Sequence, residues 1–264
     1  MLTKSHGLGN DYLVADPAQL PFDVSPARVQ LLCDRNFGVG SDGLLLLQPG
    51  QFGLRIINPD GSDAEKSGNG VRIFARWLVT TGRSRSASFV IHTPGGTVPV
   101  EVQGHEVTAD MGVAVVSGPT ALDVAGQTLD VVTVNIGNPH CVIARHELDV
   151  TELRRLGPLV EHHPAFPQRT NVQLGRAVAR DRVELLIWER GAGETRASGS
   201  SSCAVFAAMH SLGRVDRAVT ASMPGGELAL RLDEHDHIWM RGPVEEVAQV
   251  TLSADLIARL QALP

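Results

Sequence analysis

Short apolar runs that alternate with polar residues, bounded by Gly, Pro, Asn or Asp, dominate the chain. This pattern is typical of strands, and it predicts strands over 43–47, 53–58, 88–93, 97–102, 132–136, 183–189 and 227–232. Apolar residues at helical spacing predict helices over 25–35, 71–82, 203–213 and 253–263. The second and third of these helices each end at a glycine, which suits a left-handed cap.

The order of these elements repeats once along the chain. The segments "EKSGNGVRIFARWL" (65–78) and "ETRASGSSSCAVFAAMHSL" (194–212) each contain a Ser-Gly turn that opens a mostly apolar helix, between an acidic turn and further strands. Chance similarity of two helix starts is one explanation. The other is a pair of similar α+β halves, with the apolar helices wrapped by sheet and both helix N-termini near a shared ligand cleft.

Composition narrows the class of protein. The chain has 264 residues, 43% hydrophobic and 20% charged, which is ample for a buried core. A net charge of −6 and the lack of a long Lys/Arg cluster argue against nucleic acid as a partner. No apolar run approaches the roughly 18 residues of a membrane span, and the N-terminus lacks the apolar core of a signal peptide. We therefore expect a cytoplasmic protein with no membrane partner.

The three cysteines, Cys33, Cys141 and Cys203, are odd in number, widely spaced and without a CxxC pair. This spacing does not suggest zinc or redox chemistry. Buried free thiols are favoured over reactive ones.

The two Ser-Gly turns have the chemistry of an anion site. A helix N-terminus presents unpaired N–H groups and a partial positive charge, and small residues such as Gly68 and Gly199 let a ligand approach the backbone. Two such termini would hold one carboxylate and place Ser67 and Ser198 on the two faces of an α-carbon, as acid and base. A serine hydroxyl, however, is a far weaker acid than a thiol and needs a partner base. The serines are otherwise interpreted as capping or ligand-orienting hydroxyls.

Several polar turns carry amide and carboxylate groups: "HGLGND" (6–11), "INPDGSDAE" (57–65), "GNPHCV" (137–142), "RTNV" (169–172) and "WERGAGET" (188–195). A lone Asn-Gly or Asn-Pro turn is more often structural than functional. Together these turns favour recognition of a zwitterion, with Glu189 on an ammonium and Arg190 on a carboxylate.

These segments, in this order, resemble the diaminopimelate epimerase family of pyridoxal-phosphate-independent amino-acid racemases. The likeness runs from "HGLGNDY" through "DRNFGVGSDG", "INPDGSDAEKSGNG", "GNPHCV", "RTNV" and "ERGAGET" to "MPGGEL" and covers nearly the whole chain. It implies two pseudo-symmetric α+β halves, each with strands around a central helix and with the site between them. We expect an N-terminal half of 1–117 and a C-terminal half of 118–264, with 246–264 a candidate to pack on the first.

The resemblance also implies a reaction: LL- to meso-diaminopimelate, in the lysine and peptidoglycan pathway, by two-base proton transfer at the α-carbon, with no cofactor or metal and with a homodimer. Ser67 and Ser198 stand at the positions of the acid and base. Residues implied to bind the distal and α-amino-acid groups are Asn10, Asn58, Asn138, Asn171, Glu189 and Arg190. Residues implied to cradle the α-carboxylate are Gly68, Asn69, Gly199 and Ser200, with His140 beside the site.

The chain departs from the family at the reacting groups. The family has cysteines where this chain has Ser67 and Ser198, and some relatives have a substrate-binding glutamine where it has Gly43. An active epimerase would need His140 or a water to assist the serines. The alternatives are an amino-acid-binding paralogue without turnover, a racemase or lyase for another amino acid, and an engineered epimerase in which both thiols have been replaced.

Overall fold

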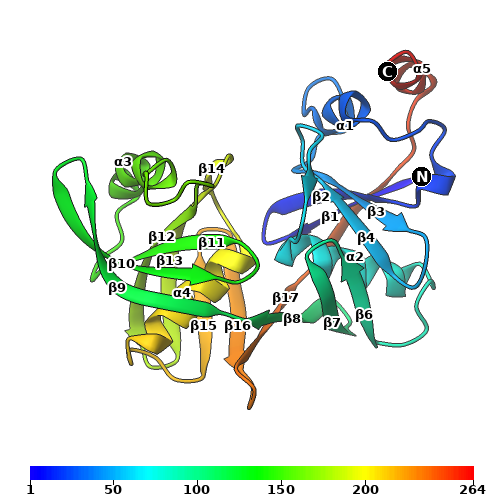
Figure 1. The fold of residues 1–264 in the computed structure, drawn as a ribbon. Helices are drawn as coiled ribbons and strands as arrows, with labels where there is room; N and C mark the ends of the chain where they lie inside the picture. The colour runs from blue at the N-terminus through cyan, green and yellow to red at the C-terminus, as the bar shows by residue number, and fades with distance from the viewer. The chain divides into compact units, whose positions relative to one another are not determined.

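The computed structural model describes residues 1–264, and the chain folds into two compact units (Figure 1). Unit 1 comprises Met1–Ala109 and Pro243–Pro264, and unit 2 comprises Asp110–Gly242. Strands β8 (Glu106–Val113) and β17 (His237–Pro243) contain the two points at which the chain passes from one unit to the other. None of the helices is long and apolar enough to cross a membrane.

Unit 1 is a mixed sheet around one central helix. Its remaining elements are β1 (Leu2–Gly7), β2 (Asn10–Ala15), the short 3-10 helix η1 (Pro17–Gln19), α1 (Pro26–Cys33), β3 (Leu44–Gln48), β4 (Gly53–Ile57), β5 (Asp63–Ala64), α2 (Gly68–Thr80), β6 (Ser88–Thr93), β7 (Gly96–Gln103), β18 (Glu245–Val250) and α5 (Ala254–Gln261). The pairs β2–β3 and β4–β6 are parallel, and the other pairs are antiparallel. Helix α2 packs against β1, β2, β4 and β7, so the core of unit 1 surrounds it.

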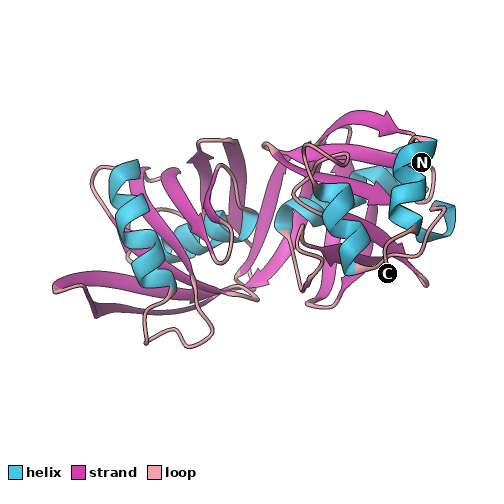
Figure 2. Cartoon of the chain, turned by 90° about the horizontal axis from the view of Figure 1, so that it is seen from above, coloured by secondary structure: helices cyan, strands magenta, loops and turns pink.

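Unit 2 is built in the same way. Its remaining elements are β9 (Val115–Val124), β10 (Gln127–Asn135), β11 (Pro139–Ala144), α3 (Val150–Glu161), β12 (Asn171–Ala179), β13 (Arg182–Glu189), β14 (Gly193–Thr195), α4 (Gly199–Ser211), β15 (Ala218–Met223) and β16 (Gly226–Leu232). The pairs β11–β12 and β13–β15 are parallel. Helix α4 contacts β9 to β13, β15 and β16. Figure 2 distinguishes the helices (cyan) from the strands (magenta) in each unit.

The predicted repeat is confirmed by this topology. The order β1, β2, α1, β3 to β5, α2, β6 to β8 recurs as β10, β11, α3, β12 to β14, α4, β15 to β17, with η1, β9, β18 and α5 outside the repeat. Parallel strands need a crossover connection, and α1 and α3 supply equivalent crossovers between β2 and β3 and between β11 and β12. The expected α+β fold of two similar halves is therefore correct.

The helix ends follow the sequence signals. Ser25 and Ser253 cap α1 and α5, because their side chains accept hydrogen bonds from N–H groups three residues on. Gly82 and Gly213 follow α2 and α4 with φ of 70° and 68°, the left-handed conformation that favours glycine. Helix α5 lies beside α1 on unit 1 (Figure 1), where Arg28 donates to the carbonyls of Leu260 and Leu263.

The glycine-rich segment "HGLGND" contains a narrower turn than its composition suggests. Gly7 ends β1 and Asn10 begins β2, and the two residues pair across the hairpin. Only Leu8 and Gly9 form the turn, with φ of 56° and 88°. Two central residues at positive φ are typical of the tight turn that suits twisted antiparallel strands. The hairpin brings the start of β2 next to the end of β1.

Helix α3 is absent from the sequence predictions because its segment contains Gly157 and Pro158, which disfavour helices. The helix nevertheless begins at an Asp149 cap, whose side chain accepts from the N–H of Thr151 at 2.8 Å. Gly157 is needed for packing: a Cβ there would lie 2.6 Å from the indole of Trp188. Tertiary contact thus selects a residue that local propensity rejects.

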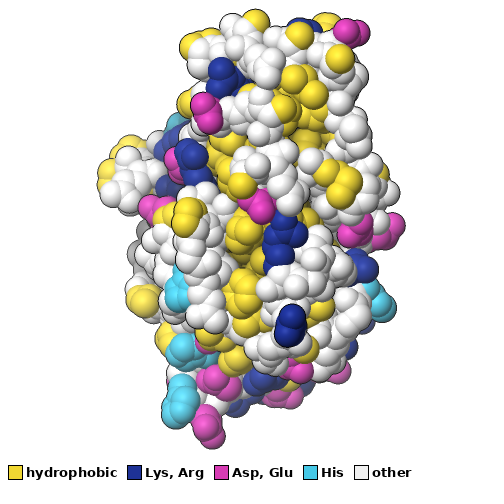
Figure 3. Space-filling view, turned by 90° about the vertical axis from the view of Figure 1, so that its right-hand side faces the viewer, with side chains coloured by type: hydrophobic (Ala, Val, Ile, Leu, Met, Phe, Trp, Pro, Cys, Tyr) yellow, Lys and Arg dark blue, Asp and Glu magenta, His cyan; other side chains and the backbone are white.

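Charged side chains of both signs are interspersed on the face of the molecule shown in Figure 3, with apolar patches between them. The chain has a net charge of −6, but the acidic and basic side chains on this face do not form one acidic and one basic surface.

We expect Gly157→Ala to destabilise the protein by about 1–3 kcal/mol, because the added methyl overlaps the Trp188 ring. Urea unfolding measures the change. Arg155→Ala, on the exposed face of the same helix, is the control and should stay within about 0.5 kcal/mol of the parent. Equal stability of the Gly157 variant and the control would show that the packing is loose.

Candidate functional site

Ser67 is the N-cap of α2 in unit 1. Its extended backbone (φ −137°, ψ 121°) lets Oγ accept a hydrogen bond from the N–H of Gly70 at 3.1 Å. A Cβ at Gly70 would lie 3.3 Å from that Oγ and 3.1 Å from Leu45, so a glycine keeps the start of the helix open. The hydroxyl therefore lies at the positive end of the helix dipole, where an anion is stabilised.

Two predicted binding residues of unit 1 contact each other. Asn69 Nδ2 donates to Asn10 Oδ1 at 3.1 Å, and Asn10 Nδ2 donates to Asp42 Oδ2 at 3.0 Å. Arg35 Nη2 donates to both Asp42 and Asp11 at 2.7 Å. Burial alone would raise the pKa of Asp11, but the hydrogen bond from Arg35 lowers it. Charge-assisted bonds thus hold the two amides in place.

Arg72, one turn into α2, is fully buried. Its Nη2 donates to Asn69 Oδ1 at 2.9 Å, and Gly7 permits this approach because a Cβ there would lie 2.9 Å from the same nitrogen. The guanidinium adds a positive charge near the start of α2. Sequence patterns missed Arg72, because arginine in a helix is normally exposed.

Tyr12 is a second residue of unit 1 that the sequence analysis missed. It is the only tyrosine of the chain, it is 7% exposed, and its hydroxyl lies 3.3 Å from Ser67 Oγ. A Cβ at Gly43 would lie 2.8 Å from Tyr12 Cε1. Gly43 therefore makes room for the phenol ring.

Asn58 lies apart from this network. Its Nδ2 donates to Ser62 Oγ at 3.0 Å, and its N–H donates to the carbonyl of Ser62 at 2.8 Å. These bonds close the turn between β4 and β5. The structure therefore joins Asn10 and Asn69 directly but gives Asn58 a local partner.

Ser198 is the N-cap of α4 in unit 2, with nearly the same backbone as Ser67 (φ −148°, ψ 123°). Its Oγ accepts from the N–H of Ser201 at 3.4 Å and lies 3.5 Å from Ser200 Oγ. The side chain is 4% exposed in the structure. Both serines are helix caps, as one interpretation of the sequence expects.

A buried chain of hydrogen bonds supports the start of α4. His140 Nε2 lies 2.9 Å from Asn138 Oδ1, and His140 Nδ1 lies 3.0 Å from Gln173 Nε2. Gln173 Nε2 also donates to Ser201 Oγ at 3.0 Å. Because the Gln173 amide donates to Nδ1, the ring proton resides on Nε2 and is donated to Asn138. These hydrogen bonds do not reach Ser198 directly. They hold Ser201, whose N–H donates to Ser198 Oγ.

His140 is neutral and occupied at both ring nitrogens. Burial lowers the pKa of its imidazole to about 3, with a smaller contribution from the charge of Arg190. The unprotonated ring nitrogen, Nδ1, already accepts a hydrogen bond from Gln173 Nε2. Within unit 2, His140 therefore orders the start of α4 rather than assisting Ser198 as a base.

The stability of the protein should depend on pH through His140. Its pKa is lower in the folded protein than in the unfolded chain, so the unfolded chain binds the proton first, and stability falls as the pH falls from about 6.5 towards 3. We expect His140→Gln, which takes up no proton there, to lose about 2 kcal/mol less than the parent between about pH 7 and pH 5. Urea unfolding at both pH values measures this, with the exposed His146→Gln as control. An identical acid loss in parent and His140→Gln would contradict the assignment.

Asn171 joins two predicted binding segments of unit 2. Its Nδ2 donates to the carbonyl of Pro139 at 2.9 Å, and its Oδ1 accepts from the N–H of Arg190 at 3.0 Å. Glu189 is half-buried at the end of β13, and the Arg190 side chain is exposed. The sequence-predicted Glu-Arg pair is thus tied through Asn171 to the segment that contains His140.

Glu161, at the end of α3, holds the loop that follows Glu189 and Arg190. Its Oε2 accepts from Trp188 Nε1 at 2.8 Å, and its Oε1 accepts from the N–H of Gly191 at 2.9 Å and from Arg169 at 3.2 Å. Burial alone would raise the pKa of Glu161, but these hydrogen bonds lower it. Glu161 escaped the sequence analysis because α3 itself did.

The three cysteines are buried and form no disulfide, as predicted. Burial raises the pKa of Cys141 to about 12 and also raises the pKa of Cys33. Neither thiol ionises readily, so neither replaces a catalytic thiolate. No group of three or more His, Cys, Asp or Glu side chains is placed to hold a metal ion.

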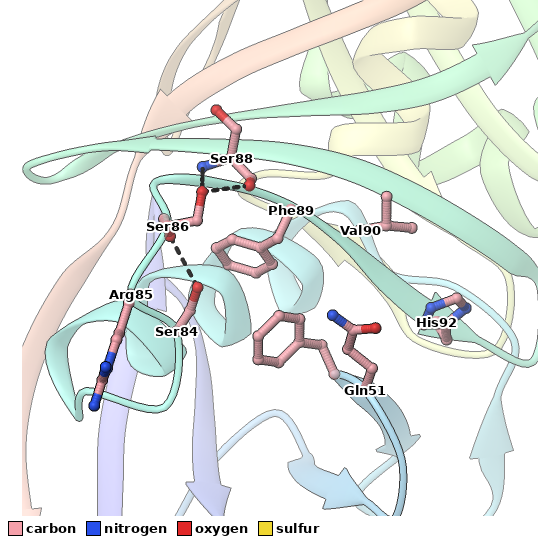
Figure 4. Close-up of a pocket in the computed structure, with 9 residues that line it drawn as sticks. Gln51, Ser84, Arg85, Ser86, Ser88, Phe89, Val90 and His92 are labelled. Carbon is pink, nitrogen blue, oxygen red and sulfur yellow. Dashed lines mark hydrogen bonds between the residues drawn. The ribbon is translucent and has the colours of Figure 1, made fainter.

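An open surface pocket of about 570 Å³ lies in unit 1 (Figure 4). Its rim includes Ser84 and Ser86, whose hydroxyls donate to the carbonyls of Ser86 and Ser88 at 2.8 and 2.7 Å. The rings of Phe52 and Phe89 form its apolar part, with centroids 4.9 Å apart. None of the sequence-predicted site residues lines this pocket.

The chain matches a known protein family over two segments, one in each half of the sequence. The family model "Diaminopimelate epimerase" matches residues 2–117 and 132–247. "Diaminopimelate epimerase 2" of Nostoc sp. is 42% identical, over 97% of this chain and 96% of the relative. The chloroplastic diaminopimelate epimerase of Oryza sativa subsp. japonica is 40% identical, over 92% of this chain and 77% of the relative.

Two solved structures are similar in fold. One is a probable proline racemase from Agrobacterium radiobacter with bound carbonate, with a TM-score of 0.73, 14% identity, and 96% of this chain and 93% of that chain covered. The other is a hydroxyproline epimerase from Agrobacterium vitis with bound trans-4-hydroxy-L-proline, with a TM-score of 0.72, 15% identity, and 94% and 90% covered. At these identities the likeness shows the fold alone.

Proposed function

The chain belongs to the diaminopimelate epimerase family, and from this premise we propose that it epimerises diaminopimelate or a similar α-amino acid. Protons would move between the α-carbon and Ser67 on one face and Ser198 on the other. The observation that carries the proposal is the pair of equivalent serine-capped starts of α2 and α4. In each, one hydroxyl lies beside the N–H groups of a central helix.

Recognition of the substrate follows from chemistry. N–H groups at the two helix starts suit the α-carboxylate, and amides with one Glu-Arg pair suit ammonium and carboxylate groups. The carboxylate would be held at Gly68, Asn69, Gly199 and Ser200. The other substrate groups would be held by Asn10, Asn58, Asn138, Asn171, Glu189 and Arg190, with His140 behind the second helix start. We further propose a cytoplasmic homodimer that uses no cofactor or metal.

The serines set the expected speed of the reaction. A gap on the order of five pKa units between a serine hydroxyl and a thiol corresponds to about 7 kcal/mol. A helix N-terminus stabilises a developing anion by about 0.3–2 kcal/mol, which offsets only part of this cost. The positive charge of buried Arg72 acts in the same direction. Proton transfer should therefore be slow compared with a thiolate enzyme.

The function is tested by incubating the purified protein with LL- and with meso-diaminopimelate in deuterated water. We expect deuterium at the α-carbon and interconversion of the two isomers, both read by NMR and mass spectrometry. The matched control is the Ser67→Ala, Ser198→Ala double variant, which keeps the pocket but loses both hydroxyls. Absence of exchange at high protein concentration would sink the proposal.

A second candidate is an amino-acid-binding protein without turnover. It is favoured by the surroundings of Ser198, whose hydroxyl contacts only the N–H of Ser201 and the hydroxyl of Ser200 within unit 2. No titratable group of that unit is in hydrogen-bond contact with it. Calorimetry distinguishes the two: tight binding of diaminopimelate without exchange supports this candidate.

Thiols at the two caps should accelerate the reaction. We expect the Ser67→Cys, Ser198→Cys double variant to epimerise at least about 100-fold faster than the parent, because thiolates replace weak bases at unchanged helix starts. The calorimetric Kd should change little. Ser211→Cys, at the far end of α4, controls for a thiol placed elsewhere. A cysteine pair no faster than the parent would show that these positions do not transfer protons.

A further inference from the structure

We propose that Tyr12 is the proton partner of Ser67, so that the base on that face of the substrate is a Tyr12–Ser67 dyad. The inference rests on the proposed function and deepens it, since it supplies the partner that a serine hydroxyl needs. Tyr12 acts through Ser67 and is a positioning and proton-relay residue.

The geometry comes from three elements of unit 1. Ser67 Oγ accepts the N–H of Gly70 at 3.1 Å, and the Tyr12 hydroxyl lies 3.3 Å away from the same Oγ. Either hydroxyl can donate to the other. The N–H of Leu13 donates to the carbonyl of Gly43 at 3.0 Å, which fixes the strand next to the ring. A side chain at position 43 would overlap the ring, so the dyad depends on this glycine.

The chemistry favours a phenol over a second serine. The reference pKa of tyrosine is about 10, several units below that of a serine hydroxyl. When Ser67 takes the α-proton, the bond from carbon to hydrogen breaks and a new O–H forms on Ser67. Tyr12, which has first given its own phenol proton to water and is a phenolate, accepts the original Ser67 proton, and the electron pair stays on the α-carbon. In the reverse direction the phenol returns its proton through Ser67. Charge and protons balance, and no further reactant is needed.

The two faces of the substrate then differ. Within unit 2, Ser198 has the N–H of Ser201 and the hydroxyl of Ser200 as neighbours, and neither is a base. Protonation from that side leaves an alkoxide with no phenol to share its charge. The dyad should therefore exchange the α-proton of one isomer with retention faster than the protein inverts it.

The experiment compares Tyr12→Phe in the parent and in the Ser67→Cys background. We expect α-proton exchange to fall about 100-fold in the parent, a typical contribution of a proton-transfer group. In the Ser67→Cys background, where the thiol ionises by itself, it should fall less than about threefold. Exchange by the parent should rise with pH towards the ionisation of a phenol, and Tyr12→Phe should lose that rise.

Ser84→Ala is the matched control, because Ser84 is 5% exposed in the same unit and its hydroxyl donates to a backbone carbonyl. It should leave exchange unchanged. Equal losses from Tyr12→Phe in both backgrounds would make Tyr12 a packing residue and overturn the dyad. Unchanged exchange in Tyr12→Phe overturns the dyad alone. An inactive parent beside an active cysteine pair overturns the dyad and the serine mechanism together.

Discussion

The unpaired N–H groups at the starts of α2 and α4 are the constraint on which the rest of the structure depends. Both helices are enclosed by strands, and most of their residues are buried. The N–H groups of the first turn have no partner within the helix, and burial requires those donors to be satisfied. One is satisfied by a serine cap in each unit, and a helix N-terminus of this kind suits a negatively charged ligand.

The two units support their helix starts by different means. In unit 1 the support is charged: Arg35 holds Asp42, which holds Asn10, and buried Arg72 holds Asn69. In unit 2 it is neutral, because burial keeps His140 without charge between amide groups. The same topology therefore gives two different electrostatic environments. A developing anion is better stabilised beside a cation and a phenol than beside neutral amides and hydroxyls.

The hydroxyl at each helix start affects the chemistry of the site more than the fold. Relatives that are 42% and 40% identical cover 97% and 92% of this chain, and the side chain at the start of both α2 and α4 is a serine. Serine is a good N-cap, so a hydroxyl suits the fold at that position. A hydroxyl is also a far weaker acid than a thiol, so the same side chain is a poor proton-transfer group by itself. In unit 1, Gly43 leaves space for the ring of Tyr12, and the hydroxyl of Tyr12 contacts Ser67 Oγ.

Local patterns in the sequence determined the strands with alternating residues, the capped helices and the repeat of a Ser-Gly turn before an apolar helix. These features depend on neighbours a few residues apart, which one stretch of chain can specify. Helix α3 required the contact of Gly157 with Trp188, which outweighs poor propensity. The partners of the serine caps also required the tertiary structure, because Tyr12 and Ser67 are 55 residues apart and Gln173 and Ser201 are 28 apart. Sequence alone therefore determined where the two capping hydroxyls stand, and only folding decided what lies beside them, since a hydrogen bond between residues far apart in the chain leaves no periodic signal.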